Sequence, residues 1–371
     1  MTAALTVIVV SGLLYLRSAG PSPANYAGPA RLSQLAGRYW PDFYFVTPSL
    51  GWAAIAQMDS DRVWVFRTTD GSSHWQMQFV TTEPSPRAPM IRFFDTGNGY
   101  LFTWRLYRTS DGGAHWETIS LPDATEDFAL ASPRRGWAVD NAAAPPSLYA
   151  TTDGGLTWHL VGEAPAPLYG KGFRGYDFRP SGEGWAGVQA GTPTVYATFD
   201  GGASWRPIGL PPPPQPIPQP VGKGYPSVPT YVTAILLTPG NGVVVDELED
   251  FGGESFFVTR DRGATWNPVS GPPPPATFRD ITFIDSRQWW ASRFGVLFKS
   301  SDAGRTWRPV TTVIDIPGDW TAGSAHGIDS RHAWLLLTAQ ISPAVRIQAR
   351  MLLMSSDGGL HWGPVNVPQP G

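Results

Sequence analysis

The densest acidic run in the chain contains Asp246, Glu247, Glu249 and Asp250. Two carboxylates, one of them held protonated, are what the hydrolysis of a glycosidic bond requires. A short run of consecutive acids is also typical of a solvated loop, and we interpret this one as a loop between the second and third strands of a repeat unit. An acid/base pair is the alternative interpretation.

Other catalytic or metal-binding patterns are missing from the sequence. Three of the six histidines (His74, His115 and His361) stand directly before a tryptophan in a repeated phrase, and none has H-E-x-x-H spacing. No G-x-S-x-G, P-loop or dinucleotide motif is found in a credible context. The absence of cysteine excludes thiol catalysis, disulfide scaffolding and cysteine-ligated metals. We therefore predict no catalytic residue, no metal site and no cofactor.

A repeated eight-residue phrase that ends in tryptophan is the strongest signal in the chain. Its seven copies fit Ser/Thr-x-Asp-x-Gly-x-x-Trp, with Ser72 in the glycine position of the first copy. We call the phrase the Asp–Trp turn. Its period of about 40–60 residues indicates an array of supersecondary units. The paired residues are Asp70 and Trp75, Asp111 and Trp116, Asp153 and Trp158, Asp200 and Trp205, Asp261 and Trp266, Asp302 and Trp307, and Asp357 and Trp362.

The residue types in this phrase predict a tight turn. An aspartate carboxylate accepts backbone N–H bonds, glycine supplies a positive φ, and the Ser/Thr hydroxyl reaches the same carboxylate. The tryptophan is expected to fold back and bury a large apolar surface. Strand-like residues flank the phrase, as in LYATT before and WHLV after the third copy. The seven aspartates are therefore predicted to be structural.

A second phrase precedes each Asp–Trp turn and predicts a further strand. It is an apolar segment that carries Gly or Trp, such as GWAA at 51–54 and GWAV at 136–139. Four antiparallel strands in a unit of about 40 residues are typical of a propeller blade. The predicted fold is all-β: a seven-bladed β-propeller of four-stranded antiparallel blades, with an Asp–Trp turn in each blade, over residues 41–370.

The repeated turn resembles the Asp-box, or BNR repeat, of sialidases, sortilin-type receptors, some polysaccharide hydrolases and the photosystem II stability/assembly factor family. Its alternation with a GWA-type strand is most similar to that last family and covers roughly residues 41–368. The resemblance implies a non-catalytic propeller at a membrane surface that binds assembly intermediates of a membrane complex. It also implies an arginine patch on one face.

The other branches of this resemblance fit less well. The Arg-Ile-Pro signature of sialidases does not occur, and sortilin-type ectodomains depend on disulfides. Related glucan hydrolases cleave their substrate between two propellers, and only one is predicted here. A carbohydrate-binding or polysaccharide-hydrolysing protein remains the alternative function. Its candidate sugar-stacking aromatics are Trp40, Trp64, Trp104 and Trp320. Packing between blades is the alternative role of these four residues.

Four arginines are the candidate partner-binding residues. Arg134 and Arg135 lie in one predicted turn of blade three, and Arg287 and Arg331 lie in the equivalent turns of blades six and seven. Equivalent turns of a propeller share one face, so these residues are expected to form a basic rim for a protein partner. The net charge of −3 gives no indication of a nucleic-acid partner.

The N-terminal segment predicts export. Residues 3–16 carry no charge, and Arg17 ends the run. A spanning helix needs roughly 20 residues, whereas this shorter run suits the apolar core of a secretory signal. Residues 1–20 are therefore predicted as a signal peptide or N-terminal membrane anchor, and residues 21–40 as a linker. The expected location is exported and extracytoplasmic, with a possible membrane tether.

Two irregular spacings predict insertions into the repeat. PPPPQPIPQP at 211–220 is expected to form an extended spacer between blades four and five, with a shorter proline run at 271–275. A longer loop is expected at 338–349, before the last Asp–Trp turn. The final strand and residues 31–45 are expected to meet where the ring closes.

Overall fold

The computed structural model describes most of the chain and contains only β-strands as regular structure in that part. The chain divides into two compact units, Met1–Leu32 and Ser33–Gly371. The described residues are 6–10, 13–17, 35–58, 60–84, 88–123, 125–140, 142, 145–165, 176–187, 194–212, 230–238, 241–248, 254–269, 281–293, 296–310, 320–342 and 347–370.

The first unit contains one antiparallel hairpin. Strand β1 (Thr6–Val10) pairs with β2 (Leu13–Arg17), from Thr6 opposite Arg17 to Val10 opposite Leu13. This hairpin falls within the segment that the sequence predicts as a signal or anchor. Among the described residues of the chain, no helix is long and apolar enough to cross a membrane.

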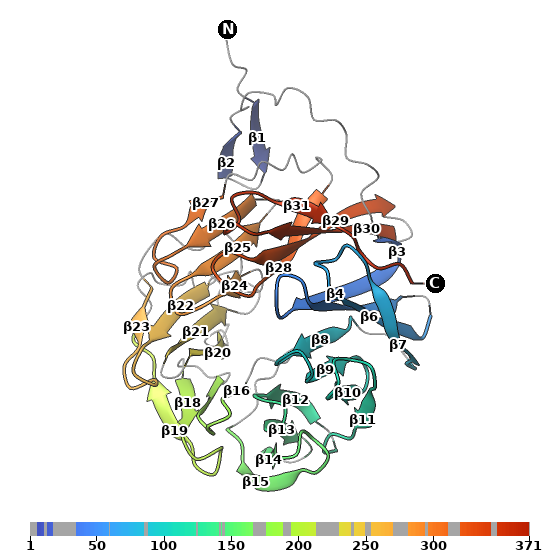
Figure 1. Cartoon of the computed structure of the whole chain (residues 1–371). Coiled ribbons are helices and arrows are strands. Elements are labelled where there is room, and N and C mark those ends of the chain that lie inside the picture. Colours follow the sequence, from blue (N-terminus) through green and yellow to red (C-terminus); the bar gives the residue numbers. More distant parts are fainter. Residues whose placement is uncertain are drawn as a thin grey trace. The chain divides into compact units, whose positions relative to one another are not determined.

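The second unit is a seven-bladed β-propeller, which confirms the predicted fold class (Figure 1). Six blades are sheets of four antiparallel strands in chain order. Blade 1 contains β4 (Tyr39–Phe45), β5 (Gly51–Gln57), β6 (Arg62–Thr68) and β7 (Gln76–Thr82), and blade 2 contains β8 (Met90–Phe93), β9 (Gly99–Phe102), β10 (Leu106–Thr109) and β11 (Glu117–Ile119). Blade 3 contains β12 (Thr125–Leu130), β13 (Gly136–Asp140), β14 (Ser147–Thr151) and β15 (His159–Glu163), and blade 4 contains β16 (Tyr176–Phe178), β17 (Gly184–Gly187), β18 (Thr194–Thr198) and β19 (Arg206–Gly209). Blade 5 contains β20 (Thr230–Thr238), β21 (Asn241–Leu248), β22 (Glu254–Thr259) and β23 (Asn267–Pro268), and blade 6 contains β24 (Ile281–Phe283), β25 (Trp289–Arg293), β26 (Val296–Ser300) and β27 (Arg308–Pro309).

Blade 7 is completed by both ends of the propeller unit. Its strands β28 (Trp320–Gly327), β29 (Ala333–Ser342) and β30 (Ile347–Ser355) are consecutive. The outer edge of β30 then pairs with β3 (Leu35–Gly37) near its start and with β31 (Gly363–Val365) near its end. The N-terminal part of the propeller chain is thereby hydrogen-bonded to the last blade, which closes the ring.

Two predicted boundaries differ from the structure near this closure. Strand β3 and the start of β4 lie in the segment 21–40 that we assigned to a linker, because β3 supplies an edge strand to blade 7. The long loop predicted at 338–349 is wrong: β29 and β30 extend through Ser342 and from Ile347 and form a long paired hairpin. The prolines at 213–220 and 271–275 lie outside the described residues.

Both faces of a blade are buried because each blade packs between two neighbours. In β6, Trp64 and Phe66 belong to a core cluster with Trp334 of blade 7. Val65, the residue between them, belongs to a cluster with Ile91 of blade 2. The strands therefore read as continuous apolar runs rather than as an alternation of apolar and polar residues.

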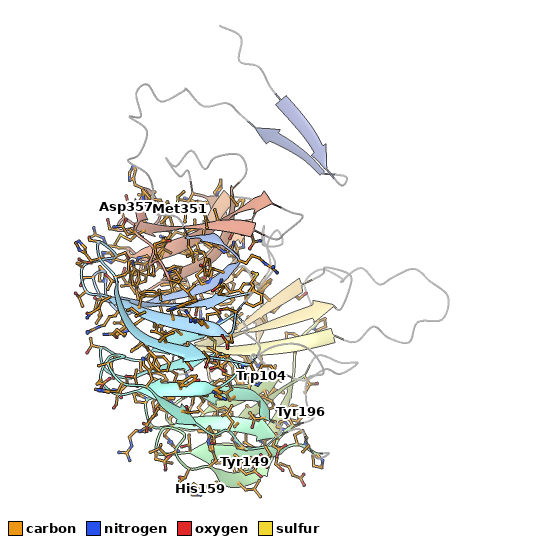
Figure 2. The ribbon with its side chains drawn as sticks, turned by 90° about the vertical axis from the view of Figure 1, so that its right-hand side faces the viewer. Trp104, Tyr149, His159, Tyr196, Met351 and Asp357 are labelled. Carbon is orange, nitrogen blue, oxygen red and sulfur yellow. The ribbon has the colours of Figure 1, made fainter. Side chains whose placement is uncertain are left out.

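The antiparallel order fixes which loops share an end of the propeller. The turn between the first and second strands, here the inner turn, lies at the same end of the blade as the Asp–Trp turn between the third and fourth strands. We call this end the Asp–Trp face. Loops between the second and third strands lie at the other end. In the side view, Asp357 lies toward one side and Trp104, between β9 and β10, lies away from it (Figure 2).

Candidate functional site

Each Asp–Trp turn is closed by hydrogen bonds to its aspartate. In the third copy, the Thr151 hydroxyl donates to Asp153 Oδ1 over 2.8 Å and accepts the backbone N–H of Gly155 over 2.8 Å. Asp153 Oδ1 also accepts the backbone N–H of Thr157 over 3.0 Å, and Oδ2 accepts the Thr157 hydroxyl over 2.5 Å. Both carboxylate oxygens are thus occupied within the turn.

These hydrogen bonds stabilise the ionised form of the carboxyl groups. Backbone and side-chain bonds from His74 lower the pKa of Asp70 to about 2, and those from His115 lower the pKa of Asp111 to about 2. Side-chain and backbone bonds from Ser204 lower the pKa of Asp200 to about 2. A carboxyl group with such a pKa stays ionised near neutral pH and is not a general acid there.

The Asp–Trp turns also connect neighbouring blades, a role that the sequence analysis did not predict. Trp52 Nε1 donates to the carbonyl of Gly112, in the turn of the next blade, over 2.9 Å. Trp137 Nε1 donates in the same way to the carbonyl of Gly201 over 2.8 Å. These donors come from the second phrase, where an aromatic residue follows glycine. Trp185 has the same spacing, but its Nε1 has no hydrogen-bond partner among the described residues, so the spacing alone does not identify the donors.

Burial separates the two sets of tryptophans. The second-strand residues Trp52, Trp137 and Trp185 are at most 2% exposed. Of the tryptophans that end the Asp–Trp turns, Trp266 and Trp362 are buried and the other five are half-buried. The deepest aromatic packing therefore lies in the second strands rather than at the turns.

The predicted arginines lie in the inner turns, on the Asp–Trp face. The backbone carbonyls of Arg134, Arg287 and Arg331 accept N–H bonds over 2.8–2.9 Å from Gly154, Ala303 and Gly358 of the Asp–Trp turns in their own blades. These three arginines occupy equivalent positions and their side chains are exposed. Arg135, the next residue, is half-buried and donates to the Pro180 carbonyl of blade 4 over 2.5 Å.

The four arginines share one face but not one contiguous patch. Arg134 and Arg135 belong to blade 3, whereas Arg287 and Arg331 belong to blades 6 and 7. In ring order, blades 4 and 5 separate them on one side, and blades 1 and 2 on the other. The four arginines therefore do not form the single basic rim that the sequence predicts.

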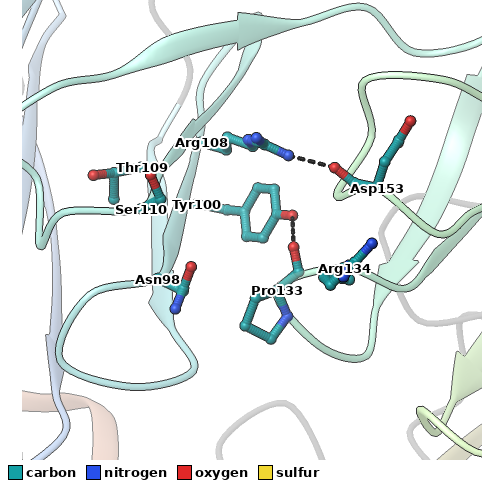
Figure 3. A pocket seen from close by; sticks show the side chains of 8 residues that line it. All are labelled: Asn98, Tyr100, Arg108, Thr109, Ser110, Pro133, Arg134 and Asp153. Carbon is teal, nitrogen blue, oxygen red and sulfur yellow. Dashed lines mark hydrogen bonds between the residues drawn. The ribbon is translucent and has the colours of Figure 1, made fainter.

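A pocket beside Arg134 is the candidate binding site. It has a volume of about 260 Å³ and lies on the Asp–Trp face between blades 2 and 3 (Figure 3). The sequence singles out Arg134 and Asp153 but predicts no pocket here, because five of the other six lining residues come from the neighbouring blade 2. The lining residues are Asn98, Tyr100, Arg108, Thr109, Ser110, Pro133, Arg134 and Asp153.

Contacts between the two blades fix the walls of this pocket. The Tyr100 hydroxyl lies 3.3 Å from the Pro133 carbonyl and 3.2 Å from the Gly154 carbonyl. Burial raises the pKa of Tyr100 to about 12, so its phenol stays neutral. Arg108 Nη1 donates to the Asp153 carbonyl over 2.5 Å, and its Nε is paired with Glu117. The pocket is therefore preorganised on both sides.

The chemistry of the pocket favours a ligand with acceptor oxygens. Arg134 contributes a guanidinium group, and Ser110 and Asn98 contribute a hydroxyl and an amide. Arg108 contributes a second guanidinium group, which is already paired with Glu117 through Nε. The one lining carboxylate of the pocket, Asp153, is already occupied by Thr151 and Thr157. Guanidinium groups form strong charge-assisted bonds with carboxylates, so an acidic group is the ligand that these residues fit best.

The acidic run and the predicted aromatic residues are placed differently from the expectation. Asp246 and Glu247 belong to strand β21 rather than to a loop, and Glu249 and Asp250 lie outside the described residues. Trp64 is 4% exposed and packs with Trp334 of blade 7, which fits the interblade alternative rather than sugar stacking, whereas Trp104 is 49% exposed. Within the described part of the chain, no three His, Asp or Glu side chains are grouped to hold a metal ion.

Comparison with solved structures supports the fold. The chain is similar to YCF48 bound to a D1 peptide (17% identity, TM-score 0.55, 88% of this chain and 98% of that one). It is also similar to YCF48 from Cyanidioschyzon merolae (15% identity, TM-score 0.51, 86% of this chain and 98% of that one). A puromycin-hydrolysing peptidase of Mycobacterium tuberculosis matches at 12% identity and TM-score 0.56, over 92% of this chain and 56% of that one.

These similarities show a shared fold. No protein-family model and no curated protein matches the chain by sequence. The matched structures include a peptide-bound protein and a peptidase, and propellers in general carry unrelated activities. Function must therefore be argued from the site on this chain.

Proposed function

We propose that this protein is a non-catalytic β-propeller that acts as a protein-interaction platform and holds an acidic group of its partner in the pocket between blades 2 and 3. The observation that carries the proposal is the pairing of Arg108 and Arg134 around one preorganised pocket. Each arginine comes from a different blade, so a bound carboxylate would contact both sides of the interblade seam.

The size of the pocket supports a protein ligand over a metabolite. Small-molecule sites usually enclose roughly 300–1,000 Å³ and are lined mainly by apolar side chains. This pocket is about 260 Å³, below that range, and its lining includes Arg108, Arg134 and Asp153. It suits one acidic side chain or a terminal carboxylate, while the rest of the partner lies on the surrounding Asp–Trp face.

The comparison with YCF48 adds indirect support. That protein, which has the same fold, has been captured with a D1 peptide bound. At 17% identity the partner itself does not transfer, and we propose only the class of ligand, a segment of another protein. The same proposal includes an exported or membrane-tethered location, with the apolar residues 3–16 as signal or anchor. It also includes a membrane complex as the partner.

A charge reversal tests the pocket directly. Arg134→Glu is expected to weaken partner binding about tenfold or more, because a charge-assisted hydrogen bond contributes about 1.5–3 kcal/mol. Arg287→Glu is the matched control: Arg287 has the equivalent inner-turn position in blade 6, and both substitutions keep the backbone carbonyl that the Asp–Trp turn needs. Equal loss in both variants, or in neither, would contradict the assignment of this pocket.

Polysaccharide binding is the second candidate, and one observation favours it. Trp104 is 49% exposed in the loop between β9 and β10, away from the Asp–Trp face. An exposed indole can stack on a sugar ring. Retention of the protein on insoluble polysaccharide, abolished by Trp104→Ala and kept by Arg134→Glu, would favour this function over the protein platform.

A further inference from the structure

The pocket between blades 2 and 3 places two cations on the Asp–Trp turn of blade 3. Arg108 directly precedes the Asp–Trp turn of blade 2, and its Nη1 donates to the Gly154 carbonyl over 3.4 Å. Arg134 lies in the inner turn of blade 3, and its Nε donates to the Thr152 carbonyl over 3.3 Å. Because the blades repeat, each other contact between two blades has a residue equivalent to each of these arginines.

The contact between blades 6 and 7 repeats this arrangement with a second pair of cations. Lys299 directly precedes the Asp–Trp turn of blade 6, and its Nζ donates to the Gly358 carbonyl over 3.4 Å. Arg331, in the inner turn of blade 7, donates through Nε to the Ser356 carbonyl over 3.3 Å. Both acceptors have the same places in the turn as in blade 3. Lys299 Nζ also lies 5.3 Å from the centre of the Trp290 ring, so its ammonium group is held at the contact between the blades.

An exposed leucine is the third shared feature of the two contacts. In the Asp–Trp turn of blade 3, Leu156 is 55% exposed, and Leu360 at the same position in blade 7 is 57% exposed. The other five turns have a small or a charged residue at this position, namely Ser73, Ala114, Ala203, Ala264 and Arg305. At both contacts, the turn that accepts hydrogen bonds from the two cations therefore also presents an apolar side chain to solvent.

The repeat alone does not produce this arrangement, because no other contact between blades has both cations within the part of the propeller that the structure describes. The equivalent pairs are Arg67 and Gly97 between blades 1 and 2, Ala150 and Gly182 between blades 3 and 4, Val258 and Arg287 between blades 5 and 6, and Met354 and Ser49 between blades 7 and 1. Between blades 4 and 5, the position of Lys299 is taken by Ala197. Arg287 thus shares the inner-turn position of Arg331 but has no cationic residue at the position equivalent to Lys299.

The acidic residues next to this second pair of cations are engaged within their own turns. Asp329 accepts the backbone N–H groups of Arg331 and His332, each over 2.7 Å, and its Oδ2 pairs with the ring of His332 over 2.8 Å. Asp357 accepts hydrogen bonds from the side chains of two other residues of its turn. Among the described residues, no carboxylate forms an ion pair with Lys299 or Arg331. Both cations therefore keep their charge for a ligand.

We propose that Lys299 and Arg331 form a second carboxylate-binding site between blades 6 and 7, for an acidic residue of a protein partner whose apolar neighbour packs on Leu360. The class of ligand rests on the proposed function, whereas the position of the site rests on the two repeated hydrogen bonds. Ammonium and guanidinium groups form charge-assisted hydrogen bonds with carboxylates. Both sites lie on the Asp–Trp face, so one partner with two acidic segments occupies both, and the two contacts together bind far more tightly than either alone.

Carbodiimide coupling tests this site without knowledge of the partner. Lys299 is one of three lysines in the chain, and Lys171 and Lys223 serve as internal references. The probe is the capped peptide acetyl-Leu-Glu-Leu-amide, whose single carboxylate is joined by carbodiimide to an amine that lies beside it. The full-length protein is treated with the probe, and mass spectrometry measures the coupled fraction at each lysine. Acetyl-Gly-Glu-Gly-amide is the control probe, which has no apolar side chain.

The leucine probe is expected to couple to Lys299 about fivefold or more above the glycine probe, and Arg331→Gln to remove this preference, because the guanidinium that fixes the carboxylate is lost. Arg287→Gln, the matched inner-turn control, should leave coupling at Lys299 unchanged. Circular dichroism should show the same fold for all three proteins. Equal coupling of the two probes at Lys299, or equal coupling with and without the Arg331 side chain, would overturn the proposal.

Capture from detergent-solubilised host membranes separates this site from the proposed function. Arg331→Glu is expected to lower recovery of the captured partner about tenfold or more, as expected for Arg134→Glu, because either variant loses binding through two sites. Loss with Arg134→Glu but not with Arg331→Glu would overturn the second site and leave the proposed function in place. Loss with neither variant would contradict the proposed function, and coupling at Lys299 would then decide the second site by itself.

Discussion

Trp52 Nε1 donates a 2.9 Å hydrogen bond to the carbonyl of Gly112, which belongs to the Asp–Trp turn of the next blade. The turns of blades 2, 3 and 4 therefore have two roles. The aspartate holds the turn of its own blade, and the carbonyl of the next glycine accepts a hydrogen bond from Trp52, Tyr100 or Trp137 of the preceding blade. The buried Nε1 atoms of Trp185, Trp289 and Trp334 have no hydrogen-bond partner among the described residues, so this bond is not repeated by every second strand.

Removing a second-strand tryptophan is expected to destabilise the propeller more than removing a turn tryptophan. Trp52 is fully buried and hydrogen-bonded, so Trp52→Ala should lower the free energy of unfolding by about 3–5 kcal/mol. Trp158 is half-buried, so Trp158→Ala should lower the free energy of unfolding by a clearly smaller amount. Denaturant titration followed by tryptophan fluorescence compares them, and equal losses would contradict this ranking.

Ser72→Gly is expected to stabilise the protein by about 1 kcal/mol. Ser72 has φ of +76°, a conformation that favours glycine, and its buried hydroxyl has no hydrogen-bond partner among the described residues. The reciprocal change, Gly155→Ser, should destabilise, since a Cβ there would lie 2.9 Å from Ile119 Cγ2. Thermal unfolding of both variants provides the measurement. A lower melting temperature for Ser72→Gly would disprove the strain at this position.

Acid is expected to destabilise the propeller over a defined pH range. The pKa of Asp70, Asp111 and Asp200 is about 2 in the folded protein, below the ordinary value of 3.8. Because these pKa values are lower in the folded state, the ionised carboxylates stabilise the fold above pH 3.8. That contribution is lost as the pH falls from 3.8 toward 2.

The Asp200→Asn variant tests this pH dependence. It keeps the shape of the side chain but removes one titrating group, so its melting temperature should fall less steeply between pH 5 and pH 2 than that of the unmodified protein. Melting curves over this range by circular dichroism provide the measurement. Identical slopes would show that the turn carboxylate does not contribute to acid sensitivity.

Much of the fold can be predicted from the sequence, because each blade carries its own local signals. The Asp–Gly spacing in the turn around Asp153 depends on neighbouring residues only, so it can be recognised without knowledge of the tertiary structure. Closure of the ring cannot be recognised in this way, because β3 and β31 come from opposite ends of the propeller chain and pair with the same edge of β30. Their three-residue lengths leave little periodicity to detect.

The candidate site was less predictable for the same reason. Arg134 stands out in the sequence as part of an arginine pair in a turn. Tyr100 and Arg108 do not, because their role arises only when blade 2 packs against blade 3 and their side chains reach the carbonyls of Gly154 and Asp153. Sequence spacing also places arginines on one face without showing how many blades lie between them.

Affinity capture shows whether the protein holds a partner through the pocket beside Arg134. Tagged full-length protein and its Arg134→Glu variant are incubated with detergent-solubilised membranes of the host, and bound proteins are quantified by mass spectrometry. We expect a stoichiometric protein partner with the unmodified chain and at least tenfold less of it with the variant. Equal recovery of that partner with both proteins, or recovery of the unmodified chain alone, would disprove partner binding at this pocket.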